Sequence, residues 1–348
     1  MNQERLNKLR EKMDEFNIDG VVLFNEADIR YFSNFKSGGV LIVLKDQVKL
    51  FTNRLVYEEA RQLLGNSVEF GGDLDYIAKF LKSNGVLRVG FDFLRSTYAQ
   101  IKAFDEFEIV DFTNQTLILR MIKDRDEINA IKKAAVVARN AFLKVYPYLK
   151  PGLTEKEIAD ELACQLKKHG AEKEAFDTIV ATGPNAAYPH HQPTDRKIEE
   201  GDFVVIDFGA KVDGYHSDTT YTFLMGKKTD EKRELFNAVF YAQLYSTEMI
   251  APSRTKASEV YKRAKSELAK FGLDKYFIHS LGHGIGLEVH EFPFLNERND
   301  IVIQPNMVFT IEPGIYIPGK LGIRLEHMVL VKENDTEVIA FTPFMEIM

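Results

Sequence analysis

Apolar runs of strand length alternate with helical patterns over the first part of the chain. Residues 1–20 carry apolar positions at helical spacing, which predicts an opening helix. Runs rich in branched apolar residues predict strands at residues 21–24, 40–44, 48–52 and 86–93. Helical patterns interrupt this series at residues 74–82 and 97–104. The alternation predicts a small α/β domain, which we place at residues 1–117.

The rest of the chain, residues 118–348, shows helices followed by strands, twice in succession. Long periodic patterns predict helices at residues 124–146, 155–170, 230–250 and 257–271. Thr154 with Glu157 three residues later forms a capping-box pattern, which fixes where the second of these helices begins. Strands are predicted at residues 176–182, 203–210 and 215–224 and again from 307 to the end. We therefore expect a second domain of mixed α and β structure, with the hypothesis of a duplicated architecture and a site between its halves.

Composition limits the classes of protein that this chain can represent. With 348 residues and 45% hydrophobic content, each of two domains can form its own core. A net charge of −7 without a dense basic stretch argues against a nucleic-acid surface. The single Cys164 excludes a disulfide framework. The charged N-terminus and the absence of a membrane-length apolar run predict a cytoplasmic protein that does not span a membrane.

Four carboxylates and one imidazole stand in apolar or glycine-rich segments of the second domain. They are Asp207, Asp218, His283, Glu312 and Glu326. Buried carboxylates are costly unless positive charge compensates them, and no Lys or Arg is interleaved closely enough to neutralise all four. Two divalent cations would balance four carboxylates, and a hydroxide held between them would be a nucleophile near neutral pH. Oxygen ligands with one imidazole suit Mn²⁺, Co²⁺, Fe²⁺ or Zn²⁺, and these residues alone do not choose among the four.

The first two of these acids are predicted to share one face of a hairpin. Asp213 and Gly214 have the composition of a two-residue turn between two strands. This turn places Asp218 opposite Gly209 and diagonal to Asp207. The two backbones would then be about 7 to 8 Å apart, a separation that lets both side chains reach ions between them.

Seven segments of the second domain together resemble the metallopeptidase family of prolidase (Xaa-Pro dipeptidase), aminopeptidase P and methionine aminopeptidase. The segments are FDTIV (176–180), YPH (188–190), VIDFG (205–209), SDT (217–219), HSLGHGIGLEVHE (279–291), TIEPGIY (310–316) and GIRLE (322–326). They occur in order and at family-like spacing over nearly the whole second domain. The first domain resembles the extra domain that prolidase, aminopeptidase P and creatinase share.

This resemblance implies a pita-bread fold with a dinuclear metal site in residues 118–348, and a homodimer. Asp207 would bind one metal and His283 and Glu312 the other, with Asp218 and Glu326 bridging them. The ions would be Mn²⁺ or Co²⁺, with Zn²⁺ or Fe²⁺ as alternatives. The catalytic residues would be His190, His290, Glu312 and Arg324. Glu312 would act as proton shuttle, and Arg324 would orient ligand carboxylates.

The implied reaction is hydrolysis of the bond before proline in a small peptide, with Xaa-Pro dipeptides as first substrates. Two residues depart from the family pattern: Phe294 stands where a basic residue often holds a dipeptide's carboxylate, with Arg298 as a substitute further on, and His327 replaces an acid. Aminopeptidase P, acting on Xaa-Pro-Yaa peptides, is therefore the alternative. A non-catalytic pita-bread binding module is the alternative from another class, and the intact ligand set argues against it and against creatinase.

Overall fold

The computed structural model describes residues 1–339 and divides into two compact units, Met1–Arg120 and Met121–Met348. We describe each unit by itself. The expected domain boundary after residue 117 falls within helix α6 (Gln115–Met121). The assignment of residues 1–117 and 118–348 to two domains stays a prediction. Among residues 1–339, no helix combines the length and the apolar character that a membrane crossing needs.

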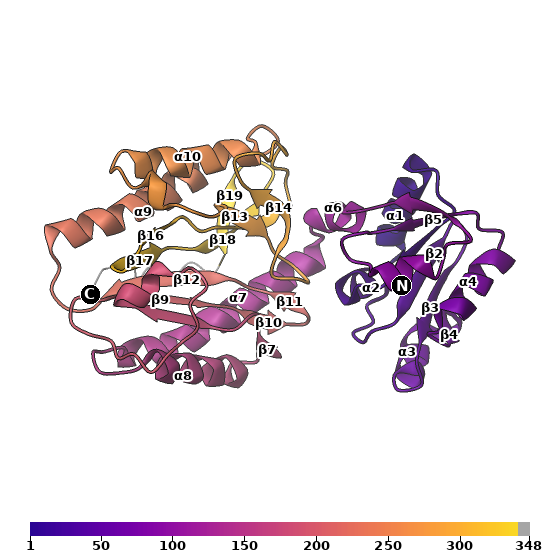
Figure 1. Cartoon of the computed structure of the whole chain (residues 1–348), viewed down its shortest axis with the longest axis horizontal. Helices are drawn as coiled ribbons and strands as arrows, with labels where there is room; N and C mark the ends of the chain where they lie inside the picture. The colour runs from indigo at the N-terminus through magenta and orange to yellow at the C-terminus, as the bar shows by residue number, and fades with distance from the viewer. Residues whose placement is uncertain (340–348) are drawn as a thin grey trace. The chain divides into compact units, whose positions relative to one another are not determined.

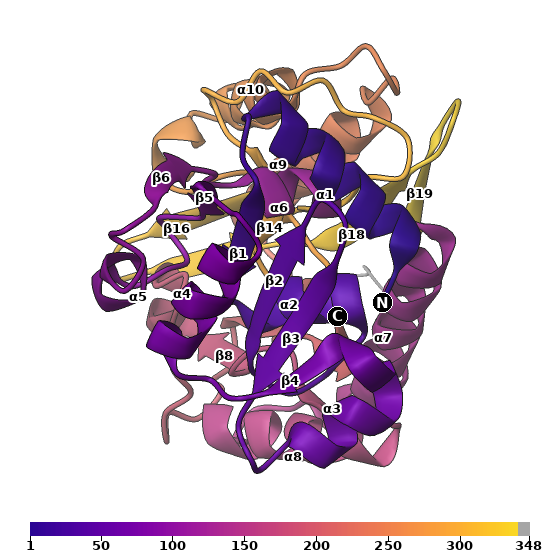
Figure 2. The same ribbon diagram turned by 90° about the vertical axis from the view of Figure 1, so that its right-hand side faces the viewer.

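The first unit is a mixed six-stranded sheet with helices, which confirms the predicted α/β class. Its strand order is β4-β3-β2-β1-β5-β6, with β1 antiparallel to β2 and parallel to β5. Figure 2 shows β1 to β4 side by side. The strands are β1 (Gly20–Leu23), β2 (Val40–Leu44), β3 (Val48–Thr52), β4 (Val68–Phe70), β5 (Arg88–Phe91) and β6 (Glu108–Asp111). The helices are α1 (Gln3–Glu15), α2 (Glu26–Ser33), α3 (Tyr57–Leu64), α4 (Leu74–Ser83), α5 (Tyr98–Lys102) and α6.

The sequence prediction missed several elements of this unit, among them α2, α3 and β4. Helix α2 is short, and its start depends on Asn25, whose side chain accepts hydrogen bonds from the amides of Ala27 and Asp28. Such a cap is a local signal that a search for long apolar periods passes over. Strand β4 has only three residues.

The second unit contains two pairs of helices with strands between them (Figure 1). Helices α7 (Arg125–Val145) and α8 (Glu155–Lys168) form one pair, and α9 (Asp230–Glu248) and α10 (Ala257–Ala269) the other. The strands of its first half are β7 (Lys173–Glu174), β8 (Ile179–Thr182), β9 (Phe203–Phe208), β10 (Ala210–Val212), β11 (Tyr215–His216) and β12 (Thr219–Leu224). The strands of its second half are β13 (Gly282–Gly284), β14 (Glu291–Leu295), β15 (Val308–Ile311), β16 (Gly314–Ile317), β17 (Leu321–Arg324), β18 (His327–Val331) and β19 (Thr336–Ile339). Four 3-10 helices complete the described chain: η1 (Gly65–Ser67), η2 (Tyr146–Tyr148), η3 (Gly183–Ala187) and η4 (Asp274–Tyr276).

Each helix pair packs apolar residues on strands of the same half, and α7 also packs Ile131 and Ala135 on strands of the second half. Phe142 of α7 and Leu162 of α8 lie in one buried cluster with Ile206 of β9. Val239 of α9 and Leu268 of α10 lie in another with Phe309 of β15. The halves also share a detail: a backbone bridge joins the residue before α8 to Lys197, and another joins the residue before α10 to Val302. The order of elements read from the sequence thus corresponds to two similar helix-and-sheet halves.

The local signals at Thr154 and at the hairpin turn are confirmed. Thr154 accepts from the Glu157 amide while the Glu157 carboxylate accepts from the Thr154 amide. Asp213 and Gly214 have φ angles of 49° and 79°, the positive values that a two-residue hairpin turn requires. Strand β9 pairs with β12 so that Asp207 faces Thr220, which is the predicted register.

Strands begin earlier in the second half than residue 307, where the sequence prediction placed them. Strand β13 has the sequence Gly-His-Gly, and glycine is depleted in strands. The glycines are required here because a Cβ on Gly282 would lie 1.9 Å from the Thr310 carbonyl oxygen. Close backbone approach therefore overrides strand propensity at this position. The last part of the predicted C-terminal strand, residues 340–348, lies outside the described residues.

Candidate metal centre

The predicted ligands come from strands of both halves of the second unit. Asp207 lies on β9 and Asp218 directly precedes β12. His283 is the middle residue of β13, Glu312 follows β15, and Glu326 lies between β17 and β18. All five line one cavity of about 450 Å³, together with the predicted catalytic residues His190, His290 and Arg324.

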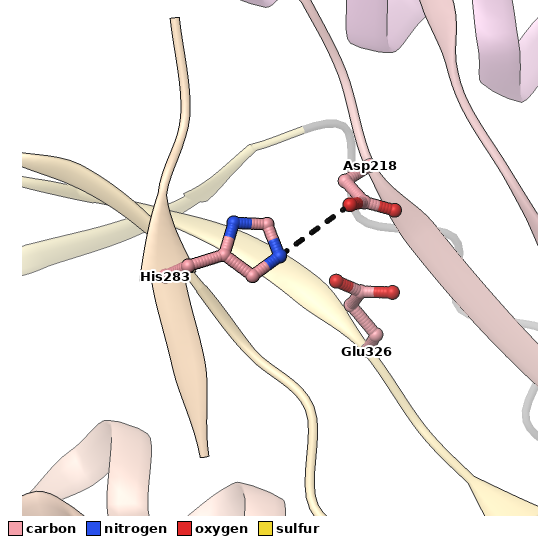
Figure 3. A group of neighbouring side chains, drawn as sticks. All are labelled: Asp218, His283 and Glu326. Atoms are coloured by element: carbon pink, nitrogen blue, oxygen red, sulfur yellow. Dashed lines mark ion pairs between the residues drawn. The ribbon is translucent and has the colours of Figure 1, made fainter. Parts of the chain in front are cut away.

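Three of the five predicted ligands form a tight group. One ligand atom each of Asp218, His283 and Glu326 lies within 4.8 Å of the other two, and all three residues are buried. Figure 3 shows the His283 ring directed at the Asp218 carboxylate, with Glu326 beside it. Asp207 and Glu312 lie outside this trio. Glu312 is next to it, because its Oε1 is 3.3 Å from His283 Nε2.

The imidazole of His283 is oriented for binding through Nε2. Its Nδ1 donates a hydrogen bond to the Gly284 carbonyl oxygen at 3.0 Å. Nε2 then points toward Asp218 Oδ2, at 3.6 Å, and Glu312 Oε1. A histidine that ligates a metal through one nitrogen commonly donates its other N–H to a backbone carbonyl in this way.

The acids of this cavity have more negative charge and more acceptor atoms than the protein itself satisfies. Asp207 Oδ1 and Asp218 Oδ1 are buried and have no hydrogen-bond partner among residues 1–339. Arg324, which donates from Nη2 to Asp207 Oδ2, is the only Lys or Arg among the described residues that line the cavity. Unsatisfied buried oxygens of this kind fit divalent cations, which bind carboxylate and imidazole donors together.

Burial and crowding of these carboxylates also shift their pKa values. Burial and the charges of neighbouring carboxylates raise the pKa of Asp218 and of Glu326 well above their usual values. Burial also opposes ionisation of Glu312, but the hydrogen bond and charge of His283 outweigh it and lower the pKa of Glu312 to about 2. Cations among these oxygens would reverse the first effect, since positive charge favours the ionised carboxylate.

Hydrogen bonds from neighbouring side chains hold two of the acids in place. The Thr220 hydroxyl donates to Glu326 Oε2 at 2.6 Å and accepts from Arg324 Nε at 3.1 Å. The Thr310 hydroxyl lies 3.1 Å from Glu312 Oε1. Sequence reasoning did not assign a role to either threonine. The signal was present for Thr220, which follows Asp218 by two positions and faces Asp207 across the hairpin.

A second chain of hydrogen bonds reaches Arg324 from the other side. Arg324 Nη1 donates to the Tyr316 hydroxyl at 2.8 Å, and this hydroxyl is 2.9 Å from His279 Nε2. His279 Nδ1 donates to the Ser280 carbonyl oxygen at 2.7 Å, so its Nε2 is free to accept from Tyr316. Neither His279 nor Tyr316 was a predicted site residue. Together they fix the guanidinium that pairs with Asp207.

The predicted catalytic histidines lie at the same cavity but on different loops. His190 follows η3 and His290 directly precedes β14. The rings of His290 and His283 are 4.3 Å apart between centroids. Burial and the charge of His283 lower the pKa of His290, which favours its neutral form. The roles assigned from the sequence, metal ligand or catalytic residue, stay predictions.

His327, one of the two departures from the family pattern, is not among the residues that line the cavity. Its Nε2 lies 3.0 Å from the Thr247 hydroxyl of α9. Burial lowers its pKa to about 4. The replacement of an acid by histidine here therefore leaves all five predicted ligands in position.

Comparison with known families agrees with this fold. Residues 129–333 match the model of metallopeptidase family M24, and residues 5–122 match the creatinase/prolidase N-terminal domain. The chain belongs to metallopeptidase family M24, and membership of this family implies divalent metal ions. Its second unit accordingly has the pita-bread fold that the sequence motifs predicted.

Individual relatives match over nearly the whole chain. A Xaa-Pro dipeptidase of Pyrococcus furiosus is 37% identical over 348 residues, which cover 98% of either chain. The structure of a Xaa-Pro dipeptidase from Bacillus anthracis superposes with a TM-score of 0.93 at 37% identity, covering 98% of both chains. The structure of an X-Pro aminopeptidase from Thermotoga maritima has a TM-score of 0.86 at 34% identity and covers 96% of this chain and 98% of that one.

Proposed function

We propose that this protein hydrolyses the peptide bond that precedes proline, with Xaa-Pro dipeptides as substrates. One observation carries the proposal: the five candidate ligands and the three candidate catalytic residues, predicted from separate segments, line a single cavity. Relatives named Xaa-Pro dipeptidase that match the whole chain support the same substrate class.

Two divalent cations would be held by the five acidic and imidazole side chains. Asp207 would bind one ion, His283 and Glu312 the other, and Asp218 and Glu326 would bridge them. Such ions polarise the scissile carbonyl and lower the pKa of a water molecule toward neutrality. Mn²⁺ or Co²⁺ is the proposed pair, and Zn²⁺ or Fe²⁺ would use the same donors.

The remaining residues would handle protons and charge around the scissile bond. Glu312, which is ionised near neutral pH, would accept a proton from the attacking water. His290 would donate its N–H to the carbonyl oxygen as negative charge develops there. His190 would contact the nitrogen of the scissile bond, and Arg324 would hold Asp207 in its orientation.

The bond before proline is a special target for a peptidase. It is a tertiary amide without an N–H, and its cis form is accessible, so enzymes that grip an extended N–H bind it poorly. A cavity that polarises the carbonyl from one side and contacts the ring nitrogen from the other does not require that N–H. Such a site therefore suits this bond.

One observation favours the aminopeptidase alternative, in which the substrate is Xaa-Pro-Yaa. Phe294 lines the cavity, whereas Arg298 is exposed in the turn after β14 and is not among the lining residues. Among the described lining residues, Arg324 is the only Lys or Arg, and it is bound to Asp207 and Tyr316. A free carboxylate placed at Phe294 would meet an apolar side chain, while a longer peptide would not place its charge there.

The test is a metal-reconstituted assay. The purified chain is stripped with a chelator, loaded with Mn²⁺, Co²⁺, Zn²⁺ or Fe²⁺, and given matched Xaa-Pro and Xaa-Pro-Yaa peptides. We expect hydrolysis only after loading, and the ratio of kcat/KM for the two peptides decides between dipeptidase and aminopeptidase. A chain that binds no divalent ion and cleaves neither peptide contradicts the proposal and favours the binding-module alternative.

A homodimer and a cytoplasmic location are further proposals from the sequence. Light scattering coupled to size-exclusion chromatography tests the first, and cell fractionation tests the second.

A further inference from the structure

A buried carboxylate outside the metal centre holds the loop that carries His190. Glu155 is the first residue of α8, and its side chain is 0% exposed. It is neither one of the predicted ligands nor a residue that lines the cavity. A buried glutamate needs several hydrogen-bond donors, and here all of them come from one segment, residues 182–194.

Each carboxylate oxygen of Glu155 accepts several hydrogen bonds from this loop. Oε1 accepts from the Thr182 amide at 2.8 Å, the Thr182 hydroxyl at 2.9 Å and Asn185 Nδ2 at 3.0 Å. Oε2 accepts from the Thr194 amide at 2.9 Å, the Thr194 hydroxyl at 2.6 Å and His191 Nε2 at 2.8 Å. The donors lie on both sides of His190 in the sequence, so one carboxylate ties the two arms of the loop together.

The loop also contacts β17 and Arg324. Arg324 Nη1 donates to the Pro189 carbonyl oxygen at 3.2 Å. A Cβ on Gly322 would lie 1.8 Å from the Ala186 carbonyl oxygen, so the backbones of η3 and β17 are in direct contact. His190 therefore stands between Pro189, which Arg324 binds, and His191, which Glu155 binds.

The other half of the unit shows that the fold itself does not require an acid at this place. The residues before α8 and α10 make equivalent backbone bridges, Thr154 to Lys197 and Lys256 to Val302. The next residue is Glu155 in the first half and Ala257 in the second, and both are fully buried. The carboxylate is present only in the half whose loop carries His190.

We propose that Glu155 is a positioning residue of the active site, which fixes residues 182–194 so that His190 faces the metal ligands. It also orients His191, whose ring lines the cavity with its Nε2 directed at the carboxylate. The expected loss of activity rests on the proposed function. The fixing of the loop rests on the hydrogen bonds alone. Misplacing a catalytic group by about 1 Å can cost roughly 100-fold in rate.

The kinetic test compares Glu155→Gln in two backgrounds, wild type and His190→Ala. An amide keeps the volume but turns N–H groups toward the donors of one oxygen, either Thr182 and Asn185 or Thr194 and His191. We expect kcat to fall roughly 100-fold in the wild-type background, with KM changed about twofold or less, because the loop acts on the reaction through His190. In the His190→Ala background the same change should cost about twofold or less.

Glu267→Gln is the matched control. Glu267 is a buried glutamate on α10, 2% exposed, bonded to Lys270 and not among the cavity-lining residues. We expect near wild-type kcat for this variant. An equal loss in both His190 backgrounds, or a Glu155→Gln variant with wild-type kcat, overturns the proposal.

Hydrogen exchange tests the loop without using activity. The Thr182 and Thr194 amides donate to Glu155, so exchange of residues 182–194 should quicken in Glu155→Gln and stay unchanged in Glu267→Gln. If the wild-type chain hydrolyses neither peptide, the proposed function fails and this measurement alone decides the role of Glu155. Thr194→Val removes a single hydroxyl donor and serves if Glu155→Gln does not fold, with a smaller change expected in the same loop. Unchanged exchange in the loop contradicts the proposal.

Discussion

Glu326 and His290 lie at the same cavity but differ in what their removal should cost. Glu326 is 4% exposed and belongs to the tight group with Asp218 and His283. His290 contacts His283 by its ring and lies outside that group. The effect of removing Glu326, the proposed bridging ligand, can therefore be measured separately from the effect of removing His290, the proposed hydrogen-bond donor.

We predict that Glu326→Ala loses metal and activity together, because both ions would share its carboxylate. His290→Ala should keep both metals and lose about 100-fold or more in kcat, in line with removal of one oxyanion donor. Metal content by mass spectrometry, measured beside kcat on each variant, checks this. Full activity in the Glu326 variant contradicts the dinuclear assignment.

The sequence identified the acids because a carboxylate within an apolar strand-like segment is unusual. Asp207 stands between Ile206 and Phe208 in a strand, where an unpaired charge is too costly to be accidental. Thr220 and Tyr316 gave no comparable signal, since threonine and tyrosine are ordinary strand residues. Glu155 stood at the start of a helix, where acids are common on the surface, so only its burial in the structure distinguishes it.

At the level of elements, a buried ion pair joins the segment before α7 to the start of β14. Lys123 Nζ lies 3.1 Å from Glu291 Oε2, and their side chains are 0% and 1% exposed. Glu291 directly follows His290 and also accepts from the Glu288 amide. This pair therefore supports the bend that presents His290.

Lys123→Met should lower the free energy of unfolding by about 3–5 kcal/mol, because it removes the cation that pairs with the buried Glu291 charge. Lys133→Met is the control, since the Lys133–Asp213 pair is exposed and should contribute about 1 kcal/mol or less. Urea unfolding followed by circular dichroism measures both. Similar losses in the two variants would show that burial of the Lys123 pair is not what matters.

The capping box of α8 gives a second prediction for an element. Thr154→Ala removes the hydroxyl that accepts from the Glu157 amide, and should cost about 1 kcal/mol of unfolding free energy. Thr154→Ser keeps that oxygen and should stay within about 0.5 kcal/mol of the wild type. Thermal unfolding of the three proteins tests the difference. An alanine variant as stable as the wild type rules out a stabilising cap.

The long helices were predictable from the sequence, whereas several short elements were not. Helices such as α7 and α8 span several turns and repeat their apolar positions at helical spacing. Strand β13 depends on the approach of Gly282 to Thr310, a contact between segments distant in sequence. No local pattern contains that information.

At the level of the whole molecule, burial of a histidine should make the fold sensitive to acid. Burial lowers the pKa of His216 to about 4 from its usual value of 6.5. The unfolded chain therefore takes up a proton below pH 6.5, whereas the folded chain does so only near pH 4. Stability is thus lost as the pH falls through this window, by about 3 kcal/mol from this group.

His216→Gln should flatten this part of the pH profile, because glutamine does not titrate and can still donate to the Gly286 carbonyl oxygen. Unfolding free energies measured from pH 7 to pH 4 in the presence of a chelator check the prediction without metal binding. An unchanged slope would mean that His216 is not the group responsible.

The two halves of the second unit each supply part of the proposed ligand set, which has a consequence for biosynthesis. Asp207 and Asp218 leave the ribosome before His283, Glu312 and Glu326. The first half alone offers two carboxylates and no imidazole from this set, too few to hold a divalent cation as the finished protein would. With this ligand set, metal would be acquired after the later strands have been translated, and its uptake would mark the end of folding rather than guide the early steps.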